Sequence, residues 1–172
     1  MSYSTGLIDT IAEWLDLNSK LLLGATGETL YMVAVAGIVG FAVGIPLGVI
    51  LHISKKGGLA ENTKLNAILG AIVNIGRSVP FLVLMVAIIP VTKLLVGTFI
   101  GTPAAIVPLT IGAIPFVARL IEGALLEVPS GLVEAAQSMG ATPTQIITKV
   151  LLPEALPTIV NSVTITLVTL VS

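Results

Sequence analysis

The chain has 172 residues, of which 55% are hydrophobic and only 10% are charged, and its formal net charge is −1. Soluble domains carry about 25% charged residues, so this composition excludes a soluble globular domain and predicts an integral membrane protein. The small net charge argues against a basic nucleic-acid-binding surface, and the absence of cysteine excludes disulfides, thiolate metal sites and a cysteine nucleophile.

The N-terminal segment is acidic and lacks the basic start and the cleavage pattern of a signal peptide. The first membrane span must therefore act as the targeting signal. A bilayer core takes about 20 apolar helical residues to cross. Four apolar stretches predict four spans of a single all-α, polytopic helical bundle that fills residues 1–172. They cover about residues 29–51, 66–96, 103–126 and 155–172.

The second stretch is longer than one span and is interrupted by Arg77 and Pro80. Two interpretations remain open for it. It is one long, broken helix, or an interfacial piece over Leu65–Gly76 that leads into a span starting near Val79. The segment Gly97–Pro103 after it predicts a turn, and the third span contains two prolines, whose freed backbone groups neighbouring helices can satisfy.

The placement of basic residues predicts the orientation. The loop His52–Lys64 holds three lysines, whereas the N-terminal segment holds only Lys20. By the positive-inside rule, this loop and the segment 122–154 are cytoplasmic and the N-terminus lies outside. The acidic residues of the N-terminal segment are Asp9, Glu13, Asp16 and Glu28. The chain ends inside the last span without a turn or an anchoring residue, so we expect a truncated sequence.

The cytoplasmic segment carries the signals for two short helices within about residues 130–151. Ser130 is placed to cap the first helix, and Gly140 is placed to end it in the left-handed conformation. Thr142 is then a good N-cap, Pro143 fits the first helical position, and Gln145 completes a capping box.

The second of these helices presents an apolar face that needs a surface to cover it. A helix in the lipid interface is usually rich in Lys and Arg, but residues 129–153 hold only Lys149. This scarcity favours docking into a groove of a partner protein, with the lipid interface and packing within the chain as alternatives. We expect Pro153 to restrict the end of this helix. The apolar face consists of Ile146, Ile147, Val150 and Leu151.

The same segment carries a spaced pattern. It consists of Glu134-Ala135-Ala136, then Gly140, then Leu152-Pro153, with the proline thirteen residues after the glycine. It resembles the cytoplasmic signature of the permease subunits of bacterial ABC importers, with Val150 where an isoleucine is usual. The resemblance implies that the loop forms coupling helices that dock on an ATP-hydrolysing subunit. The implied coupling residues are Glu134, Ala135, Ala136, Met139, Gly140, Leu152 and Pro153.

Three longer stretches resemble the methionine-importer branch of that family: NIGRSVPFLVLM, AAIVPLTIGAIPFVARLIEGALLEVPSGLVEA and GATPTQIITKVLLPEALP. This resemblance implies a multi-pass protein of the bacterial inner membrane with the type I importer fold. It also implies a homodimer of five-span permeases, two ATPase subunits and an extracytoplasmic methionine-binding lipoprotein. The chain itself would bind no cofactor, because the partner subunit uses the ATP, and the fifth span would be missing here.

Two rows of small and polar residues admit structural and functional interpretations. Small residues at four-residue spacing let helix backbones approach closely, or they border a substrate path. The row in the first span is Ala36, Gly40, Gly44 and Gly48. Hydroxyl residues share one face of the last span. Either they form hydrogen bonds to neighbouring helices, or they line a translocation path. That row is Thr158, Ser162 and Thr166.

Charged residues near the spans are few. If a span starts near Val79, Arg77 anchors it at the cytoplasmic boundary or forms an ion pair, although an ionisable residue in a membrane segment is a functional candidate by default. Arg119 and Glu122 are three residues apart on a helix and can pair.

These observations favour a non-catalytic permease subunit of an ATP-driven amino-acid importer. The chain contains no Gly-Lys pair and hence no Walker A loop, so a separate subunit must supply the energy of ATP. The alternative is a secondary transporter or channel, but ion-coupled carriers place more ionisable groups inside the bundle. An intramembrane enzyme has little support, because no cluster of His or Cys and no pair of acids lies within a span.

Overall fold

The computed structural model describes the backbone of residues 3–171 and the side chains of residues 8, 10–16 and 18–171. The side chain of Asp9 and the terminal Ser172 lie outside this description. Within it the chain is helical and contains no strand, as the composition predicts. The elements are α1 (Tyr3–Ser54), α2 (Thr63–Ser78), α3 (Phe81–Ala87), α4 (Ile89–Val96), α5 (Thr102–Leu126), α6 (Ser130–Ser138), α7 (Pro143–Ile146), the π-helical η1 (Ile147–Leu151) and α8 (Leu152–Val171).

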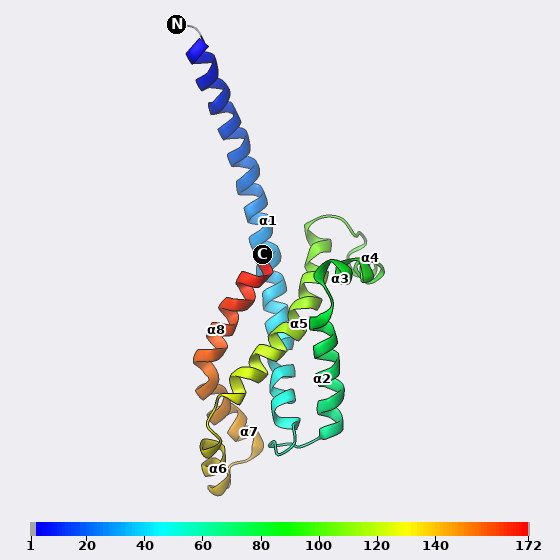
Figure 1. The fold of residues 1–172 in the computed structure, drawn as a ribbon, viewed down its shortest axis with the longest axis vertical. Coiled ribbons are helices and arrows are strands. Elements are labelled where there is room, and N and C mark those ends of the chain that lie inside the picture. The colour runs from blue at the N-terminus through cyan, green and yellow to red at the C-terminus, as the bar shows by residue number, and fades with distance from the viewer. Residues whose placement is uncertain (1–2, 172) are drawn as a thin grey trace.

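The fold is organised around α1 and α5, which share the most extensive helix–helix contact of the described chain. Gly40 lies against Ala113, and Gly48 lies against Ala118 and Ile121, so the two helices run parallel. In Figure 1 the first half of α1 projects beyond the bundle, and α2 and α8 flank α5. The predicted first span is thus the second half of one much longer helix.

The second apolar stretch forms a broken helix. Pro80 has no N–H to donate and holds Val79 in the extended region, at φ −77° and ψ 123°, which ends α2. The axes of α2 and α3 differ by 104°. The alternative of an interfacial piece followed by a span from Val79 is wrong: α2 packs along α5 and α1, and the residues after Val79 form only the short helices α3 and α4.

The start of α2 is tied to the end of α1. The side-chain N–H groups of Asn66 donate to the Leu51 carbonyl at 2.7 Å and to the Ser54 hydroxyl at 3.1 Å. Asn62 accepts the N–H of Leu65 and caps α2. The lysine-bearing connection between the two helices is therefore fixed at both ends.

The helix η1 joins α7 to α8 without a break, so the prediction that Pro153 ends a separate short helix is wrong. The N–H of Leu152 donates to the carbonyl of Ile147, five residues back, which is the wide spacing of a π turn. This wider turn lies directly before Pro153, where the proline ring would clash with an α-helical carbonyl. The second coupling helix and the last span are therefore one continuous helix, Pro143–Val171.

Within residues 3–171, three helical segments are long and apolar enough to cross a membrane: Thr10–Ser54, Thr102–Leu126 and Pro143–Val171. The bent pair α2–α3 passes the same test as a fourth. Two prolines lie inside α5, at positions 108 and 115, as the sequence predicts. The turn predicted at Gly97–Pro103 also forms, between α4 and α5, with both Gly97 and Gly101 at positive φ.

Candidate functional site

The turn between α6 and α7 is built on Gly140, whose φ of +78° favours glycine, as predicted. The N–H of Gly140 donates to the Gln137 carbonyl at 2.9 Å, and the N–H of Ala141 donates to the Ala136 carbonyl at 3.1 Å. These bonds satisfy the last carbonyls of α6 and reverse the chain within a few residues.

The capping box at the start of α7 is confirmed. The N–H of Thr142 donates to Gln145 Oε1 at 2.9 Å, and the N–H of Gln145 donates to Thr142 Oγ1 at 3.4 Å. The cap predicted at Ser130 is wrong, because the capping position falls on Pro129 and no side chain caps α6. Ser130 is already the first residue of the helix, so its hydroxyl stands one position too late.

The apolar face of the second helix packs inside the chain and is not left for a partner. Ile146 and Leu151 are buried in one core with Ile121 and Leu125 of α5. Ala136 of α6 belongs to the same core, and Leu152, Ile147 and Val150 pack against it. The expectation that these residues form the docking face is therefore wrong, because they pack against the end of α5 and against α6.

The side chains that the loop leaves exposed are different ones. Met139 is 81% exposed beside the turn, and Leu132 is also exposed. Glu134 and Ala135 are exposed on the same short helix. We call Leu132, Glu134, Ala135 and Met139 the coupling surface. Sequence reasoning selected three of these residues and missed Leu132, which follows Pro129 in a short helix with no distinctive motif of its own.

Two polar contacts lie near the end of α5, one within the helix and one to α8. Arg119 and Glu122 form the predicted ion pair at 2.5 Å, with the Glu122 side chain 13% exposed. The Thr158 hydroxyl donates to Glu127 Oε2 at 2.9 Å, across the α5–α8 junction. The buried core joins the coupling loop, residues 130–151, to both α5 and α8, and the Thr158–Glu127 bond adds a link between those two helices.

The small-residue row of α1 lies along α5. Ala36, Gly40, Gly44 and Gly48 are all buried. A methyl group on Gly44 would come within 2.7 Å of the Val117 side chain. The backbones of α1 and α5 can approach this closely because these positions lack large side chains.

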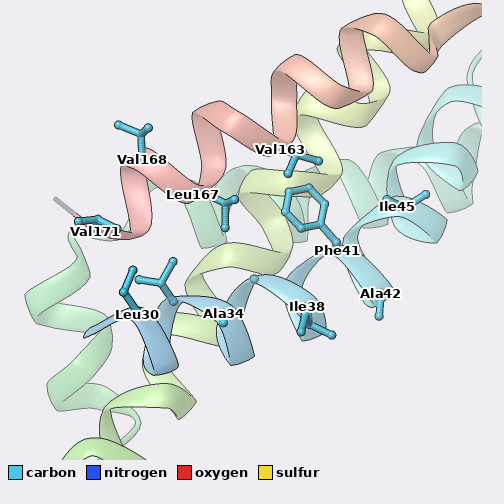
Figure 2. A pocket seen from close by; sticks show the side chains of 12 residues that line it. Leu30, Ala34, Ile38, Phe41, Ala42, Ile45, Val163, Leu167, Val168 and Val171 are labelled. Atoms are coloured by element: carbon cyan, nitrogen blue, oxygen red, sulfur yellow. The ribbon is translucent and has the colours of Figure 1, made fainter. Parts of the chain in front are cut away.

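An apolar groove of about 1070 Å³ runs between α1 and α8 (Figure 2). Figure 2 shows Phe41 and Leu167 among the side chains that line it, with Val163 beside them. Its described lining contains no charged side chain. The groove suits apolar chains or helices and offers no group that would orient a polar ligand.

A second cavity, of about 680 Å³, lies where the α2–α3 break faces α1, α5 and the end of α8. Arg77 lines it together with Phe81, Phe116 and Met32. Of the hydroxyl row predicted to line a path, only Thr166 borders this cavity. Ser162 and Thr166 are buried, and their hydroxyls donate to carbonyls of their own helix at 2.9 and 2.8 Å.

Arg77 does not lie where the sequence placed it. It is in the last turn of α2, and its neighbour Gly76 lies against Pro115, halfway along α5. It is therefore about midway along the bundle and not at the boundary of a span. Among the side chains that the structure describes, no carboxylate pairs with it, so the structural ion pair expected as an alternative is absent from them.

Comparison with known proteins agrees with this architecture. The family described as binding-protein-dependent transport system inner membrane component matches residues 44–172. The Vibrio cholerae "Probable D-methionine transport system permease protein MetI" is 84% identical over 164 residues, which cover 95% of this chain and 73% of that protein. The Escherichia coli K12 "D-methionine transport system permease protein MetI" is 57% identical, over 88% of this chain and 70% of that protein.

Solved structures give the same result at the level of the fold. An inward-facing structure of the MetNI methionine ABC transporter superposes with a TM-score of 0.86 at 57% identity, covering 88% of this chain and 70% of that one. An amino acid ABC transporter superposes at 0.70 with 21% identity, over 91% of this chain and 71% of that one, which supports the fold alone. The chain belongs to the family of binding-protein-dependent transport system inner membrane components and is a multi-pass membrane permease subunit of the type I importer kind.

Proposed function

We propose that this chain is the permease subunit of an ATP-driven methionine importer in the bacterial inner membrane. The observation that carries the proposal is the 84% identity to a D-methionine transport permease over 95% of the chain. The chain itself would catalyse no reaction and bind no cofactor, and ATP would be used by a separate subunit.

The coupling surface is the part of the chain that suits an ATPase partner. It is small and mostly apolar, it carries one exposed carboxylate at Glu134, and Met139 offers a flexible apolar anchor. Gly140, Leu152 and Pro153 would act differently, by shaping the turn and the start of α8. The MetNI transporter, to which the chain is similar, is the basis for expecting such a partner.

The rest of the assembly follows from the family. We expect a second copy of the permease and an extracytoplasmic substrate-binding lipoprotein, with the N-terminus outside and the coupling loop in the cytoplasm. The three lysines at 55, 56 and 64 and the coupling loop would then face the same side of the membrane.

The packing suggests how movement of an ATPase would reach the spans. A push on α6 acts on Ala136, which is buried against the ends of α5 and α8. Close-packed interiors shift as units rather than deform smoothly, so α5 and α8 would move together with the loop. Alternation between inward-facing and outward-facing states would follow from closure and opening of the two ATPase subunits.

Reconstituted transport tests this function and its substrate. The permease is assembled with its ATPase in lipid vesicles, binding protein is added, and uptake of labelled D- and L-methionine is compared with that of labelled leucine and histidine. We expect ATP-dependent uptake of methionine alone. Uptake of other amino acids but not methionine would overturn the substrate assignment.

A secondary transporter or channel is the competing function. It predicts uptake that follows an ion gradient and ignores the ATPase subunit. The described spans argue against it, because Arg77, Arg119 and Glu122 are the main ionisable groups along the packed helices and two of these already neutralise each other.

A further inference from the structure

The cavity around Arg77 has the chemistry of a ligand site that the proposed import function leaves unassigned. Its volume of about 680 Å³ lies in the range of about 300–1,000 Å³ that small-molecule sites occupy. Residues from α1, α2, α3, α5 and α8 line it, so every long helix of the bundle contributes to its wall. Such a position, between helices of a bundle, is where transport sites are built.

The charge at this cavity is unusual. Arg77 stands midway along the bundle, directly after Gly76, which lies against Pro115, and the cavity wall holds no acidic side chain. A guanidinium in an apolar layer is costly and is found where it faces a cavity or a charged partner. The described chain supplies no carboxylate to it, so the missing partner is an anionic group that comes from elsewhere.

The break between α2 and α3 is a second, independent observation that indicates a ligand site here. α2 ends at Ser78 and α3 leaves at 104°, so the backbone is interrupted at the same depth as Arg77. Irregular backbone at membrane depth is tolerated where it lines a cavity, and discontinuous helices of this kind mark substrate sites in transporters. The cavity is also lined by Phe116, Met32 and Phe81, the first residue of α3, which give it apolar and aromatic surface besides the guanidinium.

We propose that this cavity holds the cargo amino acid during its passage, with the Arg77 guanidinium donating hydrogen bonds to the cargo carboxylate. The fork of guanidinium donors matches a carboxylate in a way that a lysine ammonium does not. Phe81, Phe116 and Met32 form the surface for an uncharged, apolar side chain. A thioether suits this surface, because sulfur makes favourable contacts with aromatic rings. The inference rests on the proposed import function and names the ligand group that this chain itself recognises.

The test compares three variants in the complete transporter, reconstituted with its ATPase and its loaded binding protein. Arg77→Gln removes the charge, Arg77→Lys keeps the charge without the fork, and Lys93→Gln removes an exposed cation of α4 that does not line the cavity. We expect methionine uptake to fall at least about tenfold in Arg77→Gln, to fall less in Arg77→Lys, and to stay unchanged in Lys93→Gln.

The ATPase activity separates a lost ligand contact from a lost fold. We expect Arg77→Gln to hydrolyse ATP in response to loaded binding protein as the original complex does, while uptake fails. Uptake by Arg77→Gln within about twofold of the original overturns the inference. Absence of methionine uptake by the unaltered complex would instead overturn the proposed function.

If the Arg77→Gln variant does not assemble, a second pair of variants tests whether the cavity holds the cargo. Gly112 lines the cavity, and a methyl group there would lie 3.5 Å from the Leu84 side chain, an ordinary contact. Gly112→Leu fills the cavity and is therefore expected to abolish uptake, whereas Gly123→Leu, on the same helix but outside the cavity lining and with open space around it, is expected to transport normally. Equal uptake by these two variants contradicts a cargo site here.

Discussion

At the scale of single residues, the coupling loop depends on a few positions with local roles. Gly140 supplies the positive φ that ends α6, and Thr142 with Gln145 fixes the start of α7. No side chain lies within 4 Å of a methyl group placed on Gly140, so its role is conformational and not steric. Met139, directly before it, is 81% exposed.

Gly140→Ala tests the conformational role. A non-glycine residue in the left-handed region costs about 1–2 kcal/mol, and part of this is offset by the lower entropy of the unfolded chain. We expect binding of the ATPase subunit to weaken about fivefold, measured by titration of the detergent-solubilised permease. Gly131→Ala is the matched control: it lies in α6, has open space around it and is expected to bind normally. Equal binding by the two variants would show that the turn does not position the partner.

The residues that the sequence predicted correctly are those whose conformation depends on near neighbours. The capping box and the left-handed glycine are set within four residues, so short patterns predict them. The burial of Ile146 and Leu151 depends on α5, which is distant in sequence, and the pattern could not decide which surface would cover them. The prediction of where Arg77 lies was wrong for a similar reason, because its position depends on where α2 packs.

At the scale of elements, α1 and α5 form the central pair, and their spacing is set by glycine. A methyl group on Gly48 would lie 2.6 Å from the Ala118 carbonyl oxygen and 2.7 Å from the Ile121 Cβ. Both are parts of the chain that cannot rotate away. The length of the apolar stretch predicted a helix here, but only the packed structure shows which helix the small residues face.

Gly48→Ala tests this contact. The two backbones must separate to admit the methyl group, which costs about 1–3 kcal/mol in a packed core. We expect a lower apparent Tm of the detergent-solubilised protein and faster thermal inactivation. Gly24→Ala, on the same helix with nothing within 4 Å, serves as the comparison and is expected to keep or raise the Tm. An unchanged Tm for Gly48→Ala would mean that α1 and α5 are not held this closely.

The helix from α7 through η1 to α8 is continuous, although the sequence pattern predicts that it ends at Pro153. Pro153 reads as a boundary because proline cannot donate an α-helical hydrogen bond. The π turn before it absorbs the mismatch and lets the helix run on. As a result, the second helix of the loop and the last span form one continuous helix and would move together.

At the scale of the whole molecule, the bundle places its coupling surface at one end of α5 and the Arg77 cavity about midway along it. The two are joined through α5 and α8, and not by a flexible linker. Force from a cytoplasmic partner and the proposed contact with cargo would therefore meet on the same two helices.

The orientation can be tested directly, because the chain contains no cysteine. Ser19→Cys lies on the projecting half of α1, and Ala60→Cys lies in the lysine-bearing connection, both exposed. We expect a membrane-impermeant maleimide to label Ser19→Cys in intact spheroplasts and Ala60→Cys only after permeabilisation. The reverse pattern would place the N-terminus and the coupling loop on the opposite sides from those proposed.

The most direct measurement of the central claim is methionine uptake with a working and a hydrolysis-deficient ATPase partner. Vesicles receive the same amount of permease and loaded binding protein, and only the partner differs. If this chain is an ATP-driven permease, uptake occurs with the working partner and ATP, and falls to the level of empty vesicles with the deficient one. Equal uptake with both partners would contradict the account and would identify a transporter that runs without ATP.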